Sequence, residues 1–388
     1  MNRLYLDCAA NTPLLPEVKQ AMAEWLEQGG NPSSLHAPGR EAKRVLEQAR
    51  RQVAGLINAK PEEIYFTSCG SESNNWAIHG LLQANKRKGN HLVVSSIEHP
   101  SVLLTAKRLE REGYDVTYLP VTSEGIVDPD TLKAALKSTT VLVSIMHANG
   151  EIGTIEPIAE LAAITHEAGA LFHPDAIASV GHVPVDVKQL RVDALSLAAN
   201  QFYGPTGAAA LYVREGVRIL PLIDGGGQET GARSGTENLI GLIGMGEAAE
   251  LAKSQMTARV VQLTRLRDRL KEGILERVEH VRVNGSWASR LPHNLHVCIE
   301  GVSSESLVLG LDQEGIAAGI GSACNSKAMR PSHVLQAIGL SEEDAKGALL
   351  FTVGVLTTED EIARCLDVLP KVVSRLRNVT AMTVARSS

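Results

Sequence analysis

The residues of this chain that could do chemistry are few and lie far apart in the sequence. Cys324 stands in a glycine-rich, polar stretch, GIGSACNSK, which should keep its thiol exposed. A thiolate at such a place is both a nucleophile and a soft metal ligand. Gly70 and Ser71 come between a strand-like run and a helical one, where free backbone N–H groups and the helix dipole favour a phosphate group. A simple helix N-cap at Ser71 explains the same residues equally well.

The five cysteines do not form a framework of their own. They are scattered, odd in number and without C-x-x-C spacing: Cys8, Cys69, Cys298, Cys324 and Cys365. This pattern argues against a set of disulfides and against a self-contained zinc site. We expect Cys8 and Cys69 to be small buried thiols, and Cys298 and Cys365 to belong to the core.

Strand-like and helical patterns alternate through the middle of the chain and must position these residues. The apolar runs cover residues 91–96, 116–121, 140–146, 170–176 and 193–199. Such alternation predicts an α/β fold with a mainly parallel sheet covered on both faces, with ligands outside the carboxyl ends of the strands. A chain of 388 residues exceeds what one core usually serves. We therefore expect a large domain at 16–254 and a smaller α+β domain formed by 1–15 and 255–388, which carries the Cys324 loop.

Composition excludes several classes of function. The net charge of −6 and the pI near 6.1 provide no basic field for nucleic acid. The start, MNRLYLDCAANTP, has no apolar signal region, and no apolar run is long enough to span a bilayer. We expect a cytoplasmic protein whose partners are small molecules or other proteins.

Several strings together resemble the cysteine desulfurases of the class V aminotransferase family, which have the pyridoxal-phosphate (PLP) fold type I. They run in family order over essentially the full length: LDCAANTP (6–13), GNPSSLH (30–36), FTSCGSESNN (66–75), EHPSV (98–102), HANGEIGTI (147–155), PDAIASVG (174–181), FYGPTGAAALYV (202–213), GGGQETGARSGTEN (225–238) and GSACNSK (321–327). The resemblance implies a PLP-transferase-like large domain.

The resemblance also implies roles for individual residues. Gly70 and Ser71 would lie in the phosphate-binding turn. Asp175 would pair with the pyridinium nitrogen and keep the ring an electron sink, and His99 would stack on the ring and move protons. Thr236 would reach the phosphate of a neighbouring subunit, which implies a homodimer.

Cys324 matches the thiol that attacks the substrate sulfur and carries the persulfide. Family members hand that sulfur to scaffold proteins for iron–sulfur cluster assembly or to other sulfur acceptors, so a protein partner is implied. An iron–sulfur cluster held together with such a partner would take Cys324 as a ligand.

The departures from the family pattern concern the cofactor. Where the family has His-Lys, this chain has Asn200 and Gln201, and a glutamine amide cannot form the Schiff base with PLP. We therefore expect no covalently bound cofactor. Three more family contacts, to the ring oxygen, the phosphate and the substrate carboxylate, are replaced at Ala178, Ala198 and Val355, and the second asparagine of the family's HxNNEIG string is Gly150 here.

Three hypotheses remain open on the sequence. The first is a PLP-free, catalytically degenerate homodimer that serves sulfur transfer or cluster assembly through Cys324. The second is an active desulfurase or related lyase that holds PLP without a covalent bond. The third is a regulatory decoy that binds the partners of an active desulfurase.

Overall fold

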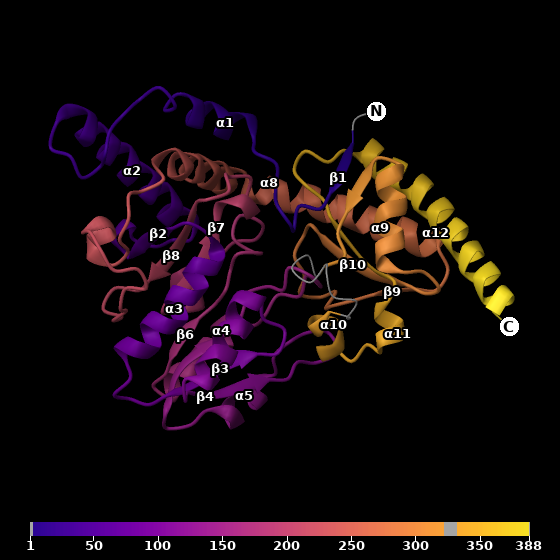
Figure 1. Ribbon diagram of the computed structural model, residues 1–388, viewed down its shortest axis with the longest axis horizontal. Helices are drawn as coiled ribbons and strands as arrows, with labels where there is room; N and C mark the ends of the chain where they lie inside the picture. Colours follow the sequence, from indigo (N-terminus) through magenta and orange to yellow (C-terminus); the bar gives the residue numbers. More distant parts are fainter. Residues whose placement is uncertain (1–2, 322–331, 388) are drawn as a thin grey trace.

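The structure is a computed structural model that describes residues 3–321 and 332–387 (Figure 1). Cys324 lies outside these described residues. Among the helices that are described, none is long and apolar enough to cross a membrane.

A central sheet of seven strands organises the first two thirds of the chain. Its strands follow the order β2-β8-β7 and β6-β5-β3-β4, and a parallel bridge from Asp175 to Ser196 joins the two groups. β8 is antiparallel to its neighbours, whereas the others run in one direction. The prediction of an α/β fold with a mainly parallel sheet is therefore confirmed. The bounds are β2 (Ile64–Thr67), β3 (His91–Ser95), β4 (Asp115–Leu119), β5 (Thr140–Ser144), β6 (Leu171–His173), β7 (Ala194–Ala198) and β8 (Ala209–Val213).

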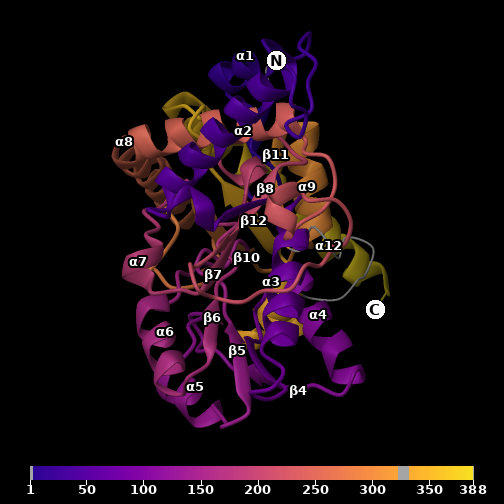
Figure 2. The same cartoon turned by 90° about the vertical axis from the view of Figure 1, so that its left-hand side faces the viewer.

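Helices cover both faces of this sheet, which explains why its central strands are apolar throughout. Every residue of β3, β5 and β7 is buried. In Figure 2, α3 and α4 lie on one side of the sheet and α5 and α6 on the other. The helices of this part are α1 (Pro16–Ala23), α2 (Ala37–Leu56), α3 (Gly70–Ala84), α4 (Pro100–Arg111), α5 (Pro129–Ala135), α6 (Ile158–Glu167) and α7 (Val187–Leu190).

The C-terminal part has a small sheet of its own. Strands β12, β10 and β9 form an antiparallel sheet, and β1, near the N-terminus, pairs in parallel with β11. The segment at the N-terminus therefore belongs to the C-terminal part of the fold. The elements are β1 (Leu4–Leu6), β9 (Val281–Val283), β10 (Asn294–Ile299), β11 (Ile316–Ala318), β12 (Ala348–Thr352), α9 (Ser304–Gln313), α10 (His333–Ala337), α11 (Glu342–Ala345) and α12 (Glu359–Ser387).

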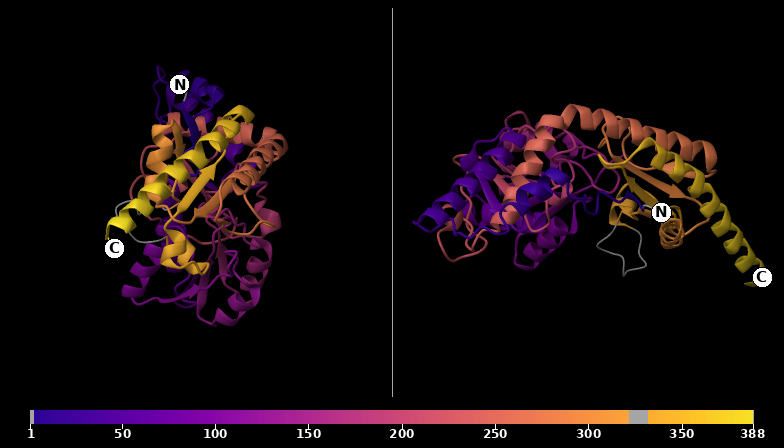
Figure 3. Two further views of the ribbon diagram at one scale, coloured as in Figure 1. Left: turned by 90° about the vertical axis from the view of Figure 1, so that its right-hand side faces the viewer. Right: turned by 90° about the horizontal axis from the view of Figure 1, so that it is seen from above.

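One long helix, α8 (Leu239–Arg277), runs along both parts (Figure 3). Its first half packs into the large-sheet core, a cluster of buried residues from Leu15 to Ala252. Its second half packs into the C-terminal core, which combines Leu4 and Leu6 with residues 263–373. The predicted boundary between residues 254 and 255 falls inside this helix, and the division into two domains at that point stays a prediction.

Candidate functional site

The turn before α3 begins the candidate site. Cys69 is the N-cap residue of α3, but its side chain makes no hydrogen bond to the backbone of the helix. Ser71 already belongs to the first helical turn. The alternative of an N-cap at Ser71 is therefore wrong. Cys69 is exposed, so the prediction of a buried thiol is also wrong for this residue, whereas it is confirmed for Cys8. Cys69 is exposed because it follows the last residues of β2, at the carboxyl edge of the sheet.

An aliphatic side chain lies directly against this turn. A Cβ placed on Gly70 would be 2.2 Å from Cδ1 of Ile177 and 3.7 Å from Cβ of Ala198. Two aliphatic side chains therefore lie beside the first residue of α3. They belong to Ile177, which follows β6, and to Ala198, the last residue of β7. Sequence reasoning did not single out Ile177, because its side-chain direction depends on the fold.

Asp175, two residues after the end of β6, is buried, and polar groups surround it, among them Asn74 of α3. Its Oδ2 accepts a hydrogen bond from Asn74 Nδ2 at 2.7 Å, and its Oδ1 accepts one from the backbone N–H of Ile177 at 3.0 Å. Burial raises the pKa of the Asp175 carboxyl, and nearby His99 opposes that shift. Asp175 and His99 therefore lie in one region of the fold, and their roles towards a cofactor stay a prediction.

His99 is exposed at the N-cap of α4 and connects to Asp175 through two other side chains. Its Nδ1 accepts hydrogen bonds from the backbone N–H and the hydroxyl of Ser101, at 3.1 and 2.7 Å. The same Ser101 hydroxyl accepts from Asn74 Nδ2 at 2.9 Å, and Asn74 also holds Asp175. Since Nδ1 accepts, the ring proton of neutral His99 is on Nε2. Asn74 and Ser101 stand in strings quoted above, but their bridging role could be read only from the structure.

Gln201 is buried, and its side chain is committed to a structural bond. The helical turn η2 (Ala199–Gln201) follows β7 directly. The Gln201 side-chain Nε2 donates to the carbonyl oxygen of Ala9 at 2.9 Å, and the backbone carbonyl oxygen of Gln201 accepts from His182 Nε2 at 2.6 Å. The carboxamide therefore ties the N-terminal segment to the end of β7.

The other positions of interest lie at three separate places. Gly150 and Ala178 face each other, because a Cβ on Gly150 would lie 3.4 Å from Cβ of Ala178. Val355 lies in the turn after β12, and its backbone N–H donates to the Tyr203 hydroxyl at 2.9 Å. Thr236 is exposed in the loop before α8.

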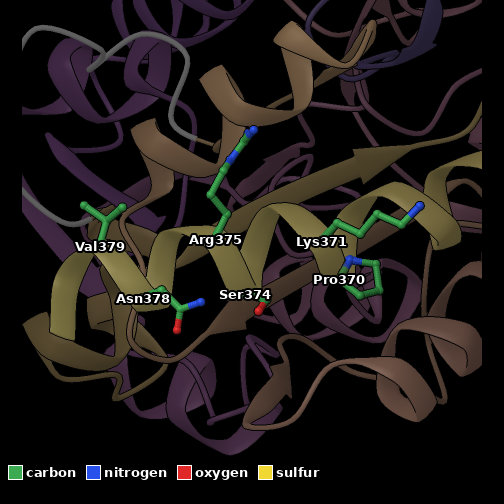
Figure 4. Close-up of a pocket in the computed structure, with 6 residues that line it drawn as sticks. All are labelled: Pro370, Lys371, Ser374, Arg375, Asn378 and Val379. Carbon is green, nitrogen blue, oxygen red and sulfur yellow. The ribbon is translucent and has the colours of Figure 1, made fainter. Parts of the chain in front are cut away.

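Two cavities lie outside this site. One, of about 700 Å³, is an open groove along α12 between Pro370 and Val379 (Figure 4). The other, of about 340 Å³, is lined by residues of α2, α7 and α8 and of the adjoining loops. Of the predicted site residues that the structure describes, none lines either of these two cavities.

Comparisons with known proteins agree with this architecture. Residues 4–364 match the family model for aminotransferase class-V. "Cysteine desulfurase IscS" of Dictyoglomus turgidum is 49% identical over 378 residues, which cover 97% of this chain and 96% of that protein. "Cysteine desulfurase IscS" of Methanosarcina thermophila is 46% identical over 381 residues, or 98% and 94% of the two chains. A solved structure titled "NIFS-LIKE PROTEIN" superimposes with a TM-score of 0.91 at 34% identity, covering 96% of this chain and 100% of the other. The chain belongs to the class-V aminotransferase family, and its relatives there are cysteine desulfurases.

Proposed function

We propose that this chain is a cysteine-desulfurase-like protein that works in sulfur transfer or iron–sulfur cluster assembly through Cys324, without covalently bound PLP. The proposal extends to a cytoplasmic homodimer that delivers to a scaffold or sulfur-acceptor protein. The observation that carries it is the side chain of Gln201. In the position where the family has its Schiff-base lysine, this side chain offers an amide, and that amide is bonded to Ala9.

The described residues fit the PLP group only in part. Asp175 is a buried carboxylate that a pyridinium nitrogen would pair with, and His99 lies near it. Cδ1 of Ile177 lies against Gly70, the first residue of α3, in the turn where the phosphate would bind. A carboxamide has no free amine to condense with an aldehyde. A covalently held PLP does not fit this site, and no reaction step is assigned to it.

The chemistry proposed for Cys324 uses no group of this chain other than the Cys324 thiolate. When a persulfide donor is present, the thiolate attacks the terminal sulfur, the donor's sulfur–sulfur bond breaks, and the donor thiolate leaves. One sulfur atom has moved and no net oxidation has occurred. Alternatively, the same thiolate is a ligand to iron when a partner supplies the other ligands.

Two measurements test the proposal. The visible absorbance of the protein as isolated is expected to lack a PLP band, and borohydride is expected to fix no PLP onto the chain. Wild type and Cys324→Ser, with a persulfide donor and an acceptor protein present, are then compared for sulfur and iron loading. Cys69→Ser is the matched control, because Cys69 is the exposed cysteine of the described residues.

Each outcome selects one of the hypotheses. Loss of loading in Cys324→Ser alone supports the proposal. Equal loading in wild type and Cys324→Ser refutes it and leaves a decoy that binds the partners of an active desulfurase. A PLP band with release of alanine from cysteine refutes it in favour of an active enzyme, with Asp175 as the residue that would hold the cofactor.

A further inference from the structure

Three cationic side chains surround the indole ring of Trp287. The ammonium nitrogen of Lys271 lies 3.8 Å from the centroid of the ring. The guanidinium carbons of Arg267 and Arg290 lie 4.7 and 5.1 Å from it. All three are within the reach of a cation–π contact, about 6 Å. Trp287 nevertheless stays 38% exposed, so the surface offers an apolar ring set among positive charges.

Positive charge exceeds negative charge around this ring. Asp268 supplies one carboxylate, which pairs with Arg267 at 2.8 Å. Arg290 is buried and donates to the carbonyl oxygen of Ser286 at 2.8 Å. In the part of the chain that the structure describes, neither Arg290 nor Lys271 has a carboxylate within ion-pair distance. Three cations thus share one carboxylate, in a chain whose net charge is −6.

The loop that carries Trp287 is fixed to the rest of the fold. Gly285 has φ of +80°, and a Cβ there would lie 2.3 Å from the carbonyl oxygen of Ile152, so the turn disfavours any other residue. The backbone N–H of Ser286 donates to the Thr154 hydroxyl at 2.9 Å. Trp287 is therefore presented from a rigid support, and a partner that binds it has little to order.

Helix α8 continues this surface. Arg267 and Lys271 are four residues apart and both contact Trp287, so this side of α8 faces the loop. Leu275 follows four residues later on the same side and is 46% exposed. Lys271 is therefore accompanied by two exposed apolar side chains. Neither of the two cavities described above includes these residues, so the surface is open and suits an extended partner better than an enclosed small molecule.

The donors around the ring are unsuited to a phosphate ion. A phosphate site needs several N–H groups aimed at one point, commonly the planar fork of an arginine. Arg267 instead donates to Asp268 and to the carbonyl oxygen of Leu291. Arg290 donates to three backbone carbonyl oxygens. Of the three cations, Lys271 is the one whose N–H groups are free to meet an anion.

We infer that Trp287, Lys271 and Leu275 form a docking surface for a carboxylate-rich segment of a partner protein. An aspartate or glutamate of that segment pairs with the Lys271 ammonium, and an apolar side chain beside it packs on Trp287 and Leu275. The charges of Arg267 and Arg290 add to the attraction and favour an acidic partner over a basic one. Tryptophan is also among the residue types that dominate binding energy at protein interfaces.

A short acidic peptide tests the inference. The probe is fluorescein-labelled Glu-Glu-Leu-Leu-Glu-Glu, titrated with the full-length protein and followed by fluorescence anisotropy. Wild type is expected to bind it at low ionic strength and to lose affinity as salt is added, because charges on an open surface are screened. The uncharged peptide Gln-Gln-Leu-Leu-Gln-Gln is expected to bind at least several-fold more weakly. Absence of binding by wild type, or equal binding of the two peptides, overturns the inference.

Two variants locate the binding. Trp287→Ala is expected to weaken it roughly tenfold or more, as for a central aromatic anchor, and Trp287→Phe less, because a ring remains. Lys271→Glu, which changes a partly exposed side chain and so keeps the fold, is expected to weaken it roughly tenfold at low salt and less at high salt. The matched controls are Trp25→Ala, at a half-buried tryptophan elsewhere, and Lys253→Glu, at another lysine of α8; both are expected to bind as wild type does. Unchanged affinity in Lys271→Glu, or an equal loss in the controls, overturns the inference.

Inorganic phosphate separates a docking surface from a general anion site. At equal ionic strength, phosphate and chloride are expected to displace the acidic peptide equally, and stronger displacement by phosphate overturns the inference. The inference goes beyond the proposed function, because it concerns where a protein partner binds and does not involve Cys324. The two therefore fail separately: equal sulfur and iron loading in Cys324→Ser refutes the proposed function and leaves binding of the peptide unchanged.

Discussion

Replacing Ile177 should decide whether the turn before α3 can again accept a phosphate. The Cδ1 of Ile177 lies against Gly70, the first residue of α3, and the N-cap residue Cys69 makes no side-chain hydrogen bond to the helix. The perturbation is Ile177→Ala, alone and together with Gln201→Lys. We expect that Gln201→Lys alone will not bind PLP, because the phosphate of the cofactor would still meet aliphatic carbon.

The magnitude follows from the bonds that would be regained. A hydrogen bond between a backbone N–H and a phosphate contributes about 1.5–3 kcal/mol. Two such bonds would tighten PLP binding by about 3–6 kcal/mol, or roughly 100-fold to 10,000-fold in Kd. Since Ile177 is half-buried, its truncation should cost less than the ~2–5 kcal/mol of a fully buried isoleucine, and the protein should stay folded.

The assay is a PLP titration followed by absorbance, then by borohydride reduction and mapping of the modified residue. Wild type, each single variant and the double variant are compared. Ile164→Ala combined with Gln201→Lys is the matched control, since Ile164 is another half-buried isoleucine and belongs to α6. The reasoning is refuted if Gln201→Lys alone is reduced onto PLP as efficiently as the double variant. It is also refuted if the Ile164 control gains as much affinity as the double variant.

Two other predictions concern stability. Arg50 and Glu229 form a bidentate ion pair, with N–O distances of 2.6 and 2.8 Å and Glu229 almost fully buried, so Glu229→Ala should destabilise the fold by about 3–5 kcal/mol in a urea titration. Lys60→Ala, which breaks the exposed pair with Glu215, should cost less than about 1 kcal/mol, and equal costs would contradict this account. Burial raises the pKa of Glu156 to about 8, so its ionisation should lower stability as the pH rises from 4.5 to 8. Glu156→Gln should therefore lose less in melting temperature than wild type between pH 5 and 8, and parallel losses would argue against a buried charge.

The central strands could be predicted from the sequence because they are buried on both faces. The apolar runs at 91–96, 140–146 and 193–199 became β3, β5 and β7 with ends within two residues of the prediction. Such runs are continuous and bounded by polar turns, so their pattern does not depend on distant residues.

The long helix α8 was only half predicted. The sequence shows a charged helical pattern over residues 256–278, whereas α8 begins at Leu239. Its first half is rich in glycine and alanine and has no amphipathic pattern. The structure gives the reason: a Cβ on Gly246 would lie 2.8 Å from Cα of Ala49, so the small residues allow close packing against α2. Contacts of this kind join distant segments and leave no local signal.

The same limit applies to the candidate site. The residue types at Asp175, His99 and Gln201 could be recognised from their strings. The contact of Ile177 with Gly70 could not, because it depends on which residues the fold places beside each other, and no pattern within one segment reports such a grouping.

The length of α8 has a consequence for how the chain unfolds. At a rise of 1.5 Å per residue, its 39 residues extend about 58 Å. Leu242 and Met245 belong to the large-sheet core, whereas Leu266 and Leu270 belong to the C-terminal core. If one core unfolded alone, the half of α8 that packs into it would lose its contacts while the other half stayed packed in the folded core. The two cores should therefore unfold in a single cooperative transition, and a ligand that binds only one of them should stabilise both.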